Sequence, residues 1–444
     1  MKFNEYFTLK SVTLNITNAC NLRCPYCFEN NKDGQKMTVE NAKIILDKCY
    51  QNYLEHRQEG DNMLFISLFG GEPFTNFEVI EELLKYSREK KYSVEFGVTT
   101  NLTILTDHMI DIIEEYELGI LVSIDGIKEI HDRNRCNSYD TVKANVKRLI
   151  DRDLGYLIEA RMTVMPKDVN NLLESIQSIY DMGIDFIAPV CVTDTSWDNE
   201  DFNNFEKNLR TVWDWVISVY NNEDNHRNLS VKMVEDYLEK VLLVPLDVYQ
   251  TTVCSAGSQK SCSIGVNGDV LPCHQRHSVK QGYQNLVMGN ILKDTDIKEI
   301  EFNNFTIKGA YDCNECPAKA ICKGGCPSEN YTYNGNGNQM NEIQCMITII
   351  LSEVAIEYQD MIMKSENIRS HKLNVLKENM KLLQLLFEKV LTQEPGSKES
   401  LVQLMYFYEK LTDAQEILLP SFRISIDEVI NQMVNINRSL KEEE

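Results

Sequence analysis

The sequence predicts an α/β fold: a partial (β/α)6 TIM-type barrel, followed by a small cysteine-rich domain and a C-terminal helical extension. Three observations predict it. Short β-branched runs alternate with amphipathic stretches over the first half, which is typical of parallel βαβ units. A segment of poor periodicity then holds eight of the 14 cysteines. The remainder of the chain has helical periodicity.

Six strands are expected in the first half, with helices between them. The expected strands are 12–16, 64–68, 93–99, 120–124, 159–164 and 185–190. The expected helices include 39–50, 77–90, 106–117, 142–152 and 169–180. Six strands are too few for a closed eight-stranded barrel and fit an open one. In such folds the chemistry lies at the carboxyl ends of the strands.

Changes of composition divide the chain into four parts. We expect the barrel over residues 1–225, a helical bridge over 226–252, the cysteine-rich domain over 253–348 and the helical extension over 349–444. A small region with many thiols and little apolar core is usually held together by metals. The extension contains a helix seam that we expect to pack against the rest of the chain, formed by Leu373, Leu376, Met380, Leu383, Phe387 and Val390.

The composition excludes several classes of protein. The formal net charge of −22 argues against nucleic acid as the main ligand, because phosphates need a basic footprint. It is compatible with a basic peptide partner, and its simplest meaning is solubility. No apolar run reaches the ~20 residues of a membrane span, and the N-terminus lacks the apolar core of a signal peptide. We expect a cytoplasmic protein with no membrane partner, whose thiols bind metals or catalyse.

The strongest motif is a three-cysteine loop that directly follows the first expected strand. It reads Cys20-Asn-Leu-Arg-Cys24-Pro-Tyr26-Cys27. Four cysteines saturate a cubic 4Fe–4S cluster, so three leave one iron open. An open position separates a reactive metal centre from a structural one. A zinc site is the alternative, but zinc usually takes four ligands in two pairs and no fourth ligand lies near.

The spacing C-x3-C-x2-C, with an aromatic residue before the last cysteine, resembles the signature of the radical S-adenosylmethionine (SAM) family. The resemblance implies that SAM chelates the open iron and that Tyr26 lies beside this cofactor. The segment Phe69-Gly70-Gly71-Glu72-Pro73 follows the second strand and is similar to the family segment that binds the SAM amino group. Glycines allow close approach of backbone to a ligand, and Glu72 would face the ammonium.

Two later segments match the same family in order. Asn101 ends the third strand, where family members contact the ribose of SAM. The resemblance implies that Ser123, at the end of the fourth strand, and Arg135 hold the SAM carboxylate, to which a guanidinium is suited. Asp125 is expected to shape the intervening turn.

The second group of cysteines resembles the SPASM domain of radical SAM maturases, since Cys254, Gly268 and Cys273 satisfy C-x13-G-x4-C. The resemblance implies two auxiliary 4Fe–4S clusters, or three clusters in all. The first would be held by Cys254, Cys262, Cys273 and Cys326, and the second by Cys313, Cys316, Cys322 and Cys345. With all eight thiols present, no open auxiliary iron is expected. Two four-cysteine zinc sites are the alternative.

The resemblance implies reductive cleavage of SAM, with electrons from a flavodoxin- or ferredoxin-type donor, and hydrogen abstraction from a peptide or protein substrate. The segment after the second strand is similar to maturases of ribosomally made peptides, which form thioether or carbon–carbon crosslinks or epimerise residues. Anaerobic sulfatase-maturating enzymes, which make formylglycine, are the alternative. They carry Cys-Asp where this chain has Cys273-His274. His274 is therefore a candidate catalytic base, with a structural role as its alternative.

A non-enzymatic iron–sulfur electron carrier is the alternative from another class, but it would not need the set of residues 70–73, Ser123 and Arg135. Peptide maturases often carry an N-terminal winged-helix module that binds the leader of the substrate, but only 19 residues precede Cys20 here. We therefore expect the leader of a peptide substrate to be held by a separate leader-binding protein, by the C-terminal helices, or not at all. Among the remaining cysteines, we expect Cys49 in the core, and Cys136 and Cys191 are candidates for bordering the active site.

Overall fold

The structure is a computed structural model, and it describes residues 1–29, 32–58, 61–222, 224–243, 254–256, 258–276, 286–300, 309–319, 321–322 and 324–364. The helix seam expected over 373–390 lies outside these ranges. So do residues 244–252 of the expected bridge and residues 365–444 of the expected extension.

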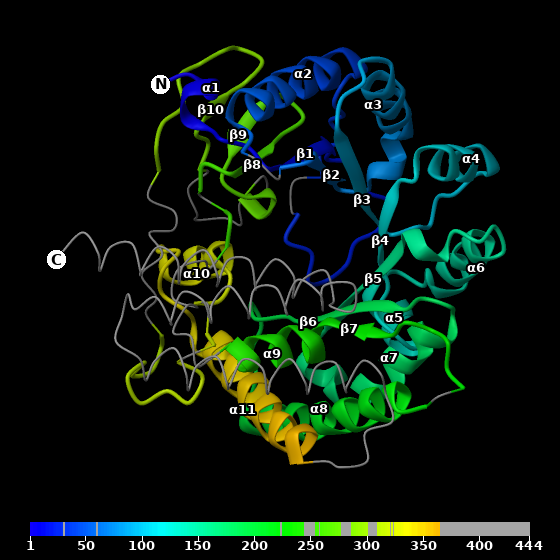
Figure 1. Ribbon diagram of the computed structural model, residues 1–444, viewed down its shortest axis with the longest axis vertical. Coiled ribbons are helices and arrows are strands. Elements are labelled where there is room, and N and C mark those ends of the chain that lie inside the picture. Colours follow the sequence, from blue (N-terminus) through cyan, green and yellow to red (C-terminus); the bar gives the residue numbers. More distant parts are fainter. Residues whose placement is uncertain are drawn as a thin grey trace, which may run out of the picture.

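One sheet of ten strands runs through the described part of the chain, in the order β10-β9-β8-β1-β2-β3-β4-β5-β6-β7, and it does not close into a barrel (Figure 1). The strands are β1 Ser11–Thr17, β2 Leu64–Gly70, β3 Val94–Thr100, β4 Gly119–Ser123, β5 Ile158–Val164, β6 Phe186–Cys191, β7 Ser230–Val231, β8 Ser261–Ile264, β9 Asp269–Leu271 and β10 Gly289–Asn290. Strands β1 to β6 pair in parallel. The predicted partial barrel is confirmed, and all six predicted strands lie within two residues of their predicted bounds.

The sheet is curved, and helices cover its outer face (Figure 1). The α-helices are α1 Phe3–Tyr6, α2 Val39–His56, α3 Phe77–Glu89, α4 Asp107–Tyr116, α5 Lys128–Asn134, α6 Tyr139–Ile150, α7 Leu172–Asp181, α8 Asn199–Tyr220, α9 Lys232–Leu243, α10 Pro327–Asn334 and α11 Glu342–Lys364. The 3-10 helices are η1 Pro73–Asn76, η2 Gly155–Leu157, η3 Pro166–Asn171 and η6 His274–Arg276. Among the described helices, none combines the length and the apolar character that crossing a bilayer requires.

Local sequence sets where several helices begin. The side chain of Thr38 accepts a hydrogen bond from the Asn41 amide at the start of α2 (3.2 Å). Thr106 does the same for Met109 at the start of α4 (3.2 Å), and Asp198 forms a capping box at the start of α8. Each cap satisfies an amide that the first turn of a helix leaves without a partner.

Side-chain alternation along the strands decides which residues face the outer helices and which face the interior of the curved sheet. In β5, residues 158, 160, 162 and 164 are buried, whereas Glu159, Arg161 and Thr163 are partly or fully exposed. Successive side chains of a strand point to opposite faces. The apolar set of β5 therefore packs beneath the outer helices, and the polar set faces the interior.

Four short strands that the sequence did not predict extend the sheet at both ends. Strand β8, in the cysteine-rich segment, pairs in parallel with β1, placing Val12 opposite Cys262. Strands β9 and β10 follow in antiparallel pairing, and β7 pairs with β6 at the other end. Strands of two to four residues carry too little periodicity to be recognised. The cysteine-rich segment therefore shares the hydrogen-bonded sheet of the barrel.

Helix α11 packs against the barrel helix α8. The hydroxyl of Tyr358 donates to Asp214 (2.6 Å), its ring stacks on Trp213 at 5.0 Å between centroids, and Arg210 pairs with Glu357. Residues up to Lys364 thus belong to the packed body of the protein.

Candidate active site

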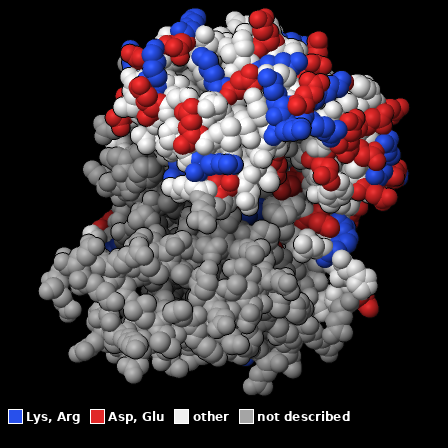
Figure 2. All heavy atoms as spheres, turned by 45° about the horizontal axis from the view of Figure 1, so that its top comes forward, with Lys and Arg blue, Asp and Glu red and all other residues white. Residues whose placement is uncertain are grey.

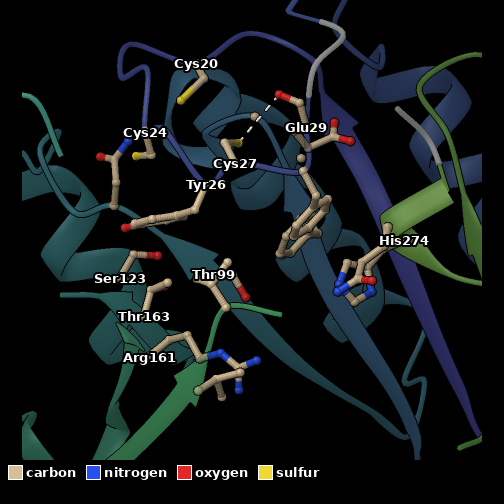
Figure 3. Close-up of a pocket in the computed structure, with 18 of the residues that line it drawn as sticks. Cys20, Cys24, Tyr26, Cys27, Glu29, Thr99, Ser123, Arg161, Thr163 and His274 are labelled. Carbon is tan, nitrogen blue, oxygen red and sulfur yellow. Dashed lines mark hydrogen bonds between the residues drawn. The ribbon is translucent and has the colours of Figure 1, made fainter. Parts of the chain in front are cut away.

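A cavity of about 490 Å³ lies in the open interior of the sheet, reaching the carboxyl ends of the parallel strands. The front-half residues that the resemblance assigns to the cluster or to SAM all line it, together with one from the cysteine-rich segment: Cys20, Cys24, Tyr26, Cys27, Gly70, Gly71, Glu72, Asn101, Ser123, Arg135 and His274. Figure 3 shows the three cysteines on one side of the cavity, Ser123 and Thr163 across from them, and His274 to one side. Segments distant in sequence therefore meet where an open barrel is expected to place its chemistry.

The three thiols of the front loop are neighbours, and each is half-buried. The pKa of Cys24 is raised to about 11, chiefly by burial, with the charges of Cys27, Asp125 and Cys20 adding to the shift and that of Arg135 opposing it. Three thiols cannot ionise together there without a positive group beside them. An iron–sulfur cluster supplies such a charge and is held by thiolates. The residues of this loop therefore fit a cluster with three cysteine ligands.

Two glycines brace the base of this loop. The amide of Gly71 donates to the carbonyl of Thr17 (2.8 Å), and the next amide donates to the carbonyl of Ala19 (2.7 Å). A Cβ at residue 70 would lie 2.1 Å from the Thr17 oxygen, and one at residue 71 would lie 2.4 Å from the Ala19 oxygen. Gly70 also has a φ of +142°. We expected these glycines to make room for a ligand, whereas here they admit the backbone of the cysteine loop.

The carboxylate of Glu72 is buried, with 1% of the residue exposed. It accepts hydrogen bonds from the amide of Asn101 (2.6 Å), the hydroxyl of Thr100 (2.6 Å) and the amide of Phe74 (3.0 Å). Burial raises its pKa, and these hydrogen bonds oppose the shift. Glu72 therefore ties the end of β2 to the end of β3. The side chain of Asn101 donates in turn to Asn21 in the cysteine loop (2.9 Å).

A buried carboxylate, Asp125, organises the opposite wall. Its oxygens accept from the hydroxyl of Tyr26 and from the amide of Thr163 (3.0 Å). It also forms an ion pair with Arg135 (3.0 Å), whose side chain is 8% exposed. The guanidinium of Arg135 lies over the Tyr26 ring at 5.4 Å. Asp125 therefore does more than shape a turn, since it fixes both an aromatic side chain of the cysteine loop and the arginine assigned to the SAM carboxylate.

The inner faces of β3 to β5 contribute polar residues that sequence reasoning missed, namely Thr99, Arg161 and Thr163. Arg161 lies opposite Ser123 in the pairing of β4 and β5. Within the described residues, neither Arg161 nor Ser123 makes a side-chain hydrogen bond or ion pair. Burial lowers the pKa of Arg161, opposed by the charges of Glu329 and Cys326. The alternation of polar and apolar residues in β5 was the signal that would have identified it.

His274 lies in the cavity wall against aromatic side chains. Its ring is 4.7 Å from that of Phe69 and 5.7 Å from that of Phe28, between centroids. Burial lowers the pKa of His274 to about 4, and Arg161 adds to the shift. The imidazole is therefore neutral near pH 7 and is a weaker base than an exposed histidine.

The rear cysteines fall into two neighbourhoods. The first contains Cys254, Cys273 and Cys326. Burial raises the pKa of Cys273, and the charge of Cys254 adds to the shift. Burial also raises the pKa of Cys326, and the charges of Glu329 and Cys273 add to that shift. The other neighbourhood is formed by Cys313, Cys316, Cys322 and Cys345. Burial raises the pKa of Cys322 and of Cys345, and the charges of neighbouring cysteines in this group add to both shifts. The amide of Gly309 donates to Cys313 Sγ (3.1 Å) and that of Ala310 to Cys345 Sγ (3.2 Å). Four thiols with amide donors fit a fully ligated cluster.

The remaining cysteines take different positions. Cys49 is fully buried in the hydrophobic core, which confirms the prediction. Cys191 lines the cavity. Cys136 is exposed and is not part of the cavity wall; its sulfur accepts from the Arg23 amide (3.3 Å). Cys262 is 4% exposed and belongs to the same hydrophobic core as Cys49. In the described part of the chain, no three Cys, His, Asp or Glu side chains converge on a position for a single metal ion.

An open α/β barrel with three thiols on the loop after β1, braced by two glycines after β2, defines the radical SAM class of proteins. Comparison with known families agrees. The Radical SAM superfamily profile matches residues 14–179, and that of the SPASM iron–sulfur cluster-binding domain matches residues 254–327. The chain therefore contains a Radical SAM domain and a SPASM domain, and both imply iron–sulfur clusters, with SAM as cofactor.

Relatives with given functions are distant. A cysteine-type anaerobic sulfatase-maturating enzyme of Clostridium perfringens is 24% identical over 340 residues, which cover 70% of this chain and 86% of that protein. The antilisterial bacteriocin subtilosin biosynthesis protein AlbA of Bacillus subtilis is 22% identical over 344 residues, covering 73% and 68%. An uncharacterised protein of Methanocaldococcus jannaschii is 34% identical over 126 residues, but the match spans 28% of this chain and 41% of that protein.

Solved structures share the fold. The anSMEcpe protein with bound AdoMet and Cp18Cys peptide has a TM-score of 0.62 and 18% identity, covering 79% of this chain and 98% of that one. Streptococcus suis SuiB bound to precursor peptide SuiA has a TM-score of 0.52 and 15% identity, covering 77% of both chains. At this identity the likeness shows the fold alone.

Proposed function

We propose that this enzyme cleaves SAM reductively and abstracts a hydrogen atom from a ribosomally made peptide, installing a thioether or carbon–carbon crosslink or an epimerised residue. One observation carries the proposal: Cys20, Cys24 and Cys27 meet Ser123 and Arg135 in one cavity. Cys20, Cys24 and Cys27 would hold an iron–sulfur cluster, which would supply the electron for reductive cleavage of SAM. The residues of the chain bind, orient and shield the reactants.

Each part of the cavity has a separate task in this proposal. Gly70 and Gly71 hold the backbone of the cysteine loop in position at the end of β2. Tyr26, fixed by Asp125, forms a wall beside the cofactor. The hydroxyl of Ser123 and the guanidinium of Arg135 receive the SAM carboxylate. Such positioning matters because the radical carbon must lie close to the hydrogen that it removes.

A peptide substrate is supported by the relatives, and the cavity has the size of a small-molecule site, as SAM requires. A volume of about 490 Å³ falls within the range of small-molecule sites, roughly 300–1,000 Å³. One relative matures the bacteriocin subtilosin, and one structural neighbour binds a precursor peptide. The surface is also compatible with this function, since Figure 2 shows Lys and Arg interspersed with Asp and Glu over the described part of one face, with no basic tract for nucleic acid.

Formylglycine formation is the second candidate, favoured by the match that covers 86% of a sulfatase-maturating enzyme. Against this candidate stands His274, a neutral and weakly basic imidazole at the position where sulfatase-maturating enzymes carry an aspartate. The two candidates separate in one assay. A cysteine peptide from a sulfatase would gain an aldehyde, detected by hydrazide labelling, only if the second candidate is right.

Anaerobic reconstitution tests the proposal. We expect about 12 Fe per chain, from three clusters of four irons, and formation of 5′-deoxyadenosine on addition of SAM and dithionite or a reduced flavodoxin- or ferredoxin-type donor. A variant with Cys20, Cys24 and Cys27 changed to Ala should lose about four irons and all 5′-deoxyadenosine. Cys136→Ser is the matched control, because it lies at an exposed site outside the cavity and keeps an acceptor for the Arg23 amide. Stoichiometric zinc without iron, and no SAM cleavage, would refute the proposal.

The C-terminal residues are proposed to bind the precursor peptide or its leader-binding partner. Because α11 packs on α8 through Tyr358, a deletion has to begin after Lys364 to leave the body intact. Removing 365–444 should abolish peptide modification while leaving SAM cleavage without substrate unchanged. Unchanged peptide turnover would contradict this assignment.

A further inference from the structure

Three aromatic rings gather at one corner of the cavity. Phe28 follows Cys27 in the front loop, Phe69 lies near the carboxyl end of β2, and His274 begins η6. All three residues line the cavity. The rings of Phe28 and Phe69 are parallel within 7°, with centroids 6.0 Å apart. The His274 ring is tilted by 54° to Phe69 and by 61° to Phe28. Two aligned rings and a third at an angle to them form what we call the aromatic corner.

The fold turns these rings towards the interior of the sheet. Successive side chains of a strand point to opposite faces. In β2, residues 64, 66 and 68 are buried in the core, whereas Ser67 and Phe69 line the cavity. Phe28, Phe69 and His274 are each only half-buried. Part of each ring is therefore open to the cavity, and such surface is stabilised when another apolar group covers it.

The aromatic corner lies away from the residues assigned to the SAM carboxylate. Figure 3 shows Tyr26 and Ser123 at one end of the cavity and His274 at the other, with Cys27 between the two ends. A group held against His274 and the two phenylalanines would therefore lie beside the cysteine loop, on the side away from Ser123. The corner can be filled while SAM occupies its own end of the cavity.

The charges around the aromatic corner disfavour a charged ligand group. Burial lowers the pKa of His274, and the positive charge of Arg161 adds to that shift. A cation in the corner would meet the same charge, which opposes its attraction to the ring faces. Glu29, the residue after Phe28, interacts electrostatically with Lys32. An anion would lose its hydration against the rings and would meet their negative faces.

We propose that the aromatic corner formed by Phe28, Phe69 and His274 binds an uncharged apolar or aromatic side chain of the peptide substrate. This inference rests on the proposed function, since it names the part of the peptide that the same cavity recognises. Covering the open ring surface supplies the affinity, and the exclusion of charged side chains supplies the selectivity. His274 contributes its ring to the recognition of the substrate.

Binding of short peptides to the reconstituted holoenzyme, with SAM in excess, tests the proposal. The probes are N-acetyl-Gly-Phe-Gly-amide and its counterparts with Leu, Lys, Asp or Gly at the centre, and ligand-observed NMR gives their dissociation constants. We expect the Phe and Leu peptides to bind about 10-fold more tightly than the other three, or better, which corresponds to about 1.4 kcal/mol. Equal binding, no binding, or tightest binding of the Lys or Asp peptide would overturn the proposal.

Variants on a single strand locate the preference. Phe69→Gln replaces a ring by a polar side chain and should reduce the preference to less than about 3-fold. Phe69→Leu keeps an apolar surface and should keep the preference for the Leu peptide, so that a folding defect at this position is recognised. Phe65→Leu is the matched control, because Phe65 lies on β2 and is 40% exposed but does not line the cavity. An unchanged preference in Phe69→Gln would overturn the proposal.

The two proposals fail in different ways. Peptide binding is measured before any reductant is added, so it does not depend on cleavage of SAM. A wild-type protein that takes up no iron, or forms no 5′-deoxyadenosine with dithionite, would refute the proposed function. Normal iron content and SAM cleavage, together with no preference among the five peptides, would overturn the role of the aromatic corner alone.

Discussion

The hydroxyl of Tyr26, in the three-cysteine loop, donates a hydrogen bond to the fully buried carboxylate of Asp125, which lies two residues beyond β4. The same carboxylate pairs with Arg135. One side chain thus connects the loop that holds the thiols to the wall assigned to SAM. Its buried negative charge balances a buried positive one.

Replacing Asp125 by Ala should therefore destabilise the protein strongly. Arg135 would remain buried without a partner, and breaking a buried ion pair in this way costs about 3–5 kcal/mol. Tyr26→Phe removes one hydrogen bond to a charged group and should cost about 1.5–3 kcal/mol. Urea unfolding of the two variants measures both. Equal losses would show that the pair with Arg135 adds nothing.

Gly71→Ala should displace the cysteine loop, because the added Cβ would lie 2.4 Å from the carbonyl oxygen of Ala19. We expect a loss of stability of about 1–3 kcal/mol, as for overpacking elsewhere, and reduced iron uptake by the front cluster. Gly119→Ala is the matched control, since its Cβ would lie 3.7 Å from the nearest atom, an ordinary contact. Thermal unfolding and iron assays distinguish them, and equal behaviour would contradict the bracing role.

Stability should depend on pH through His131. This residue is completely buried and accepts a hydrogen bond from the Asp125 amide (3.3 Å). Burial lowers the pKa of His131 from 6.5 to about 4. Below pH 6.5 the unfolded chain binds a proton that the folded protein does not, so the free energy of unfolding falls as pH falls from 6.5 towards 4, by about 2 kcal/mol between pH 7 and pH 5.

The variant His131→Asn should flatten this dependence, measured as the difference in urea midpoint between pH 7 and pH 5. The exposed His226 provides the control, and His226→Asn should leave the dependence as it is. An unaltered pH dependence in His131→Asn would show that this histidine does not titrate between the two states.

Arg161→Gln should weaken the binding of a peptide substrate and leave SAM cleavage without substrate unchanged. The guanidinium lines the cavity without an ion pair in the described residues, and a charge-assisted hydrogen bond to a ligand is worth about 1.5–3 kcal/mol. We expect KM for the peptide to rise roughly 10- to 100-fold on that basis. Arg152→Gln, on the outer surface, is the control. If 5′-deoxyadenosine formation without peptide falls equally, Arg161 acts on SAM instead.

Much of the fold was predictable because it depends on local periodicity. The six barrel strands and the Thr38 and Thr106 helix caps follow from nearby residues. The four short added strands were missed because their pairing partners lie far away in sequence, as β8 shows with β1. Length and alternation carry no signal in strands of two to four residues.

The candidate site was predicted in membership but less well in roles. Spacing and resemblance predicted that the front residues and His274 belong to one site, and in the structure these residues line one cavity. They did not reveal that Glu72 is occupied by three hydrogen bonds, or that Asp125 balances Arg135. Such roles depend on contacts between the ends of different strands. The position of Cys262 likewise depends on which face of β8 it occupies, which spacing between cysteines does not encode.

The pairing of β8 with β1 has a consequence for dissecting this protein. The first barrel strand is an interior strand here, with β2 on one side and β8 on the other. A fragment that ends before the cysteine-rich segment would leave one side of β1 bare, and an uncovered strand edge invites association with other chains. The two halves of the chain are therefore best expressed and studied together.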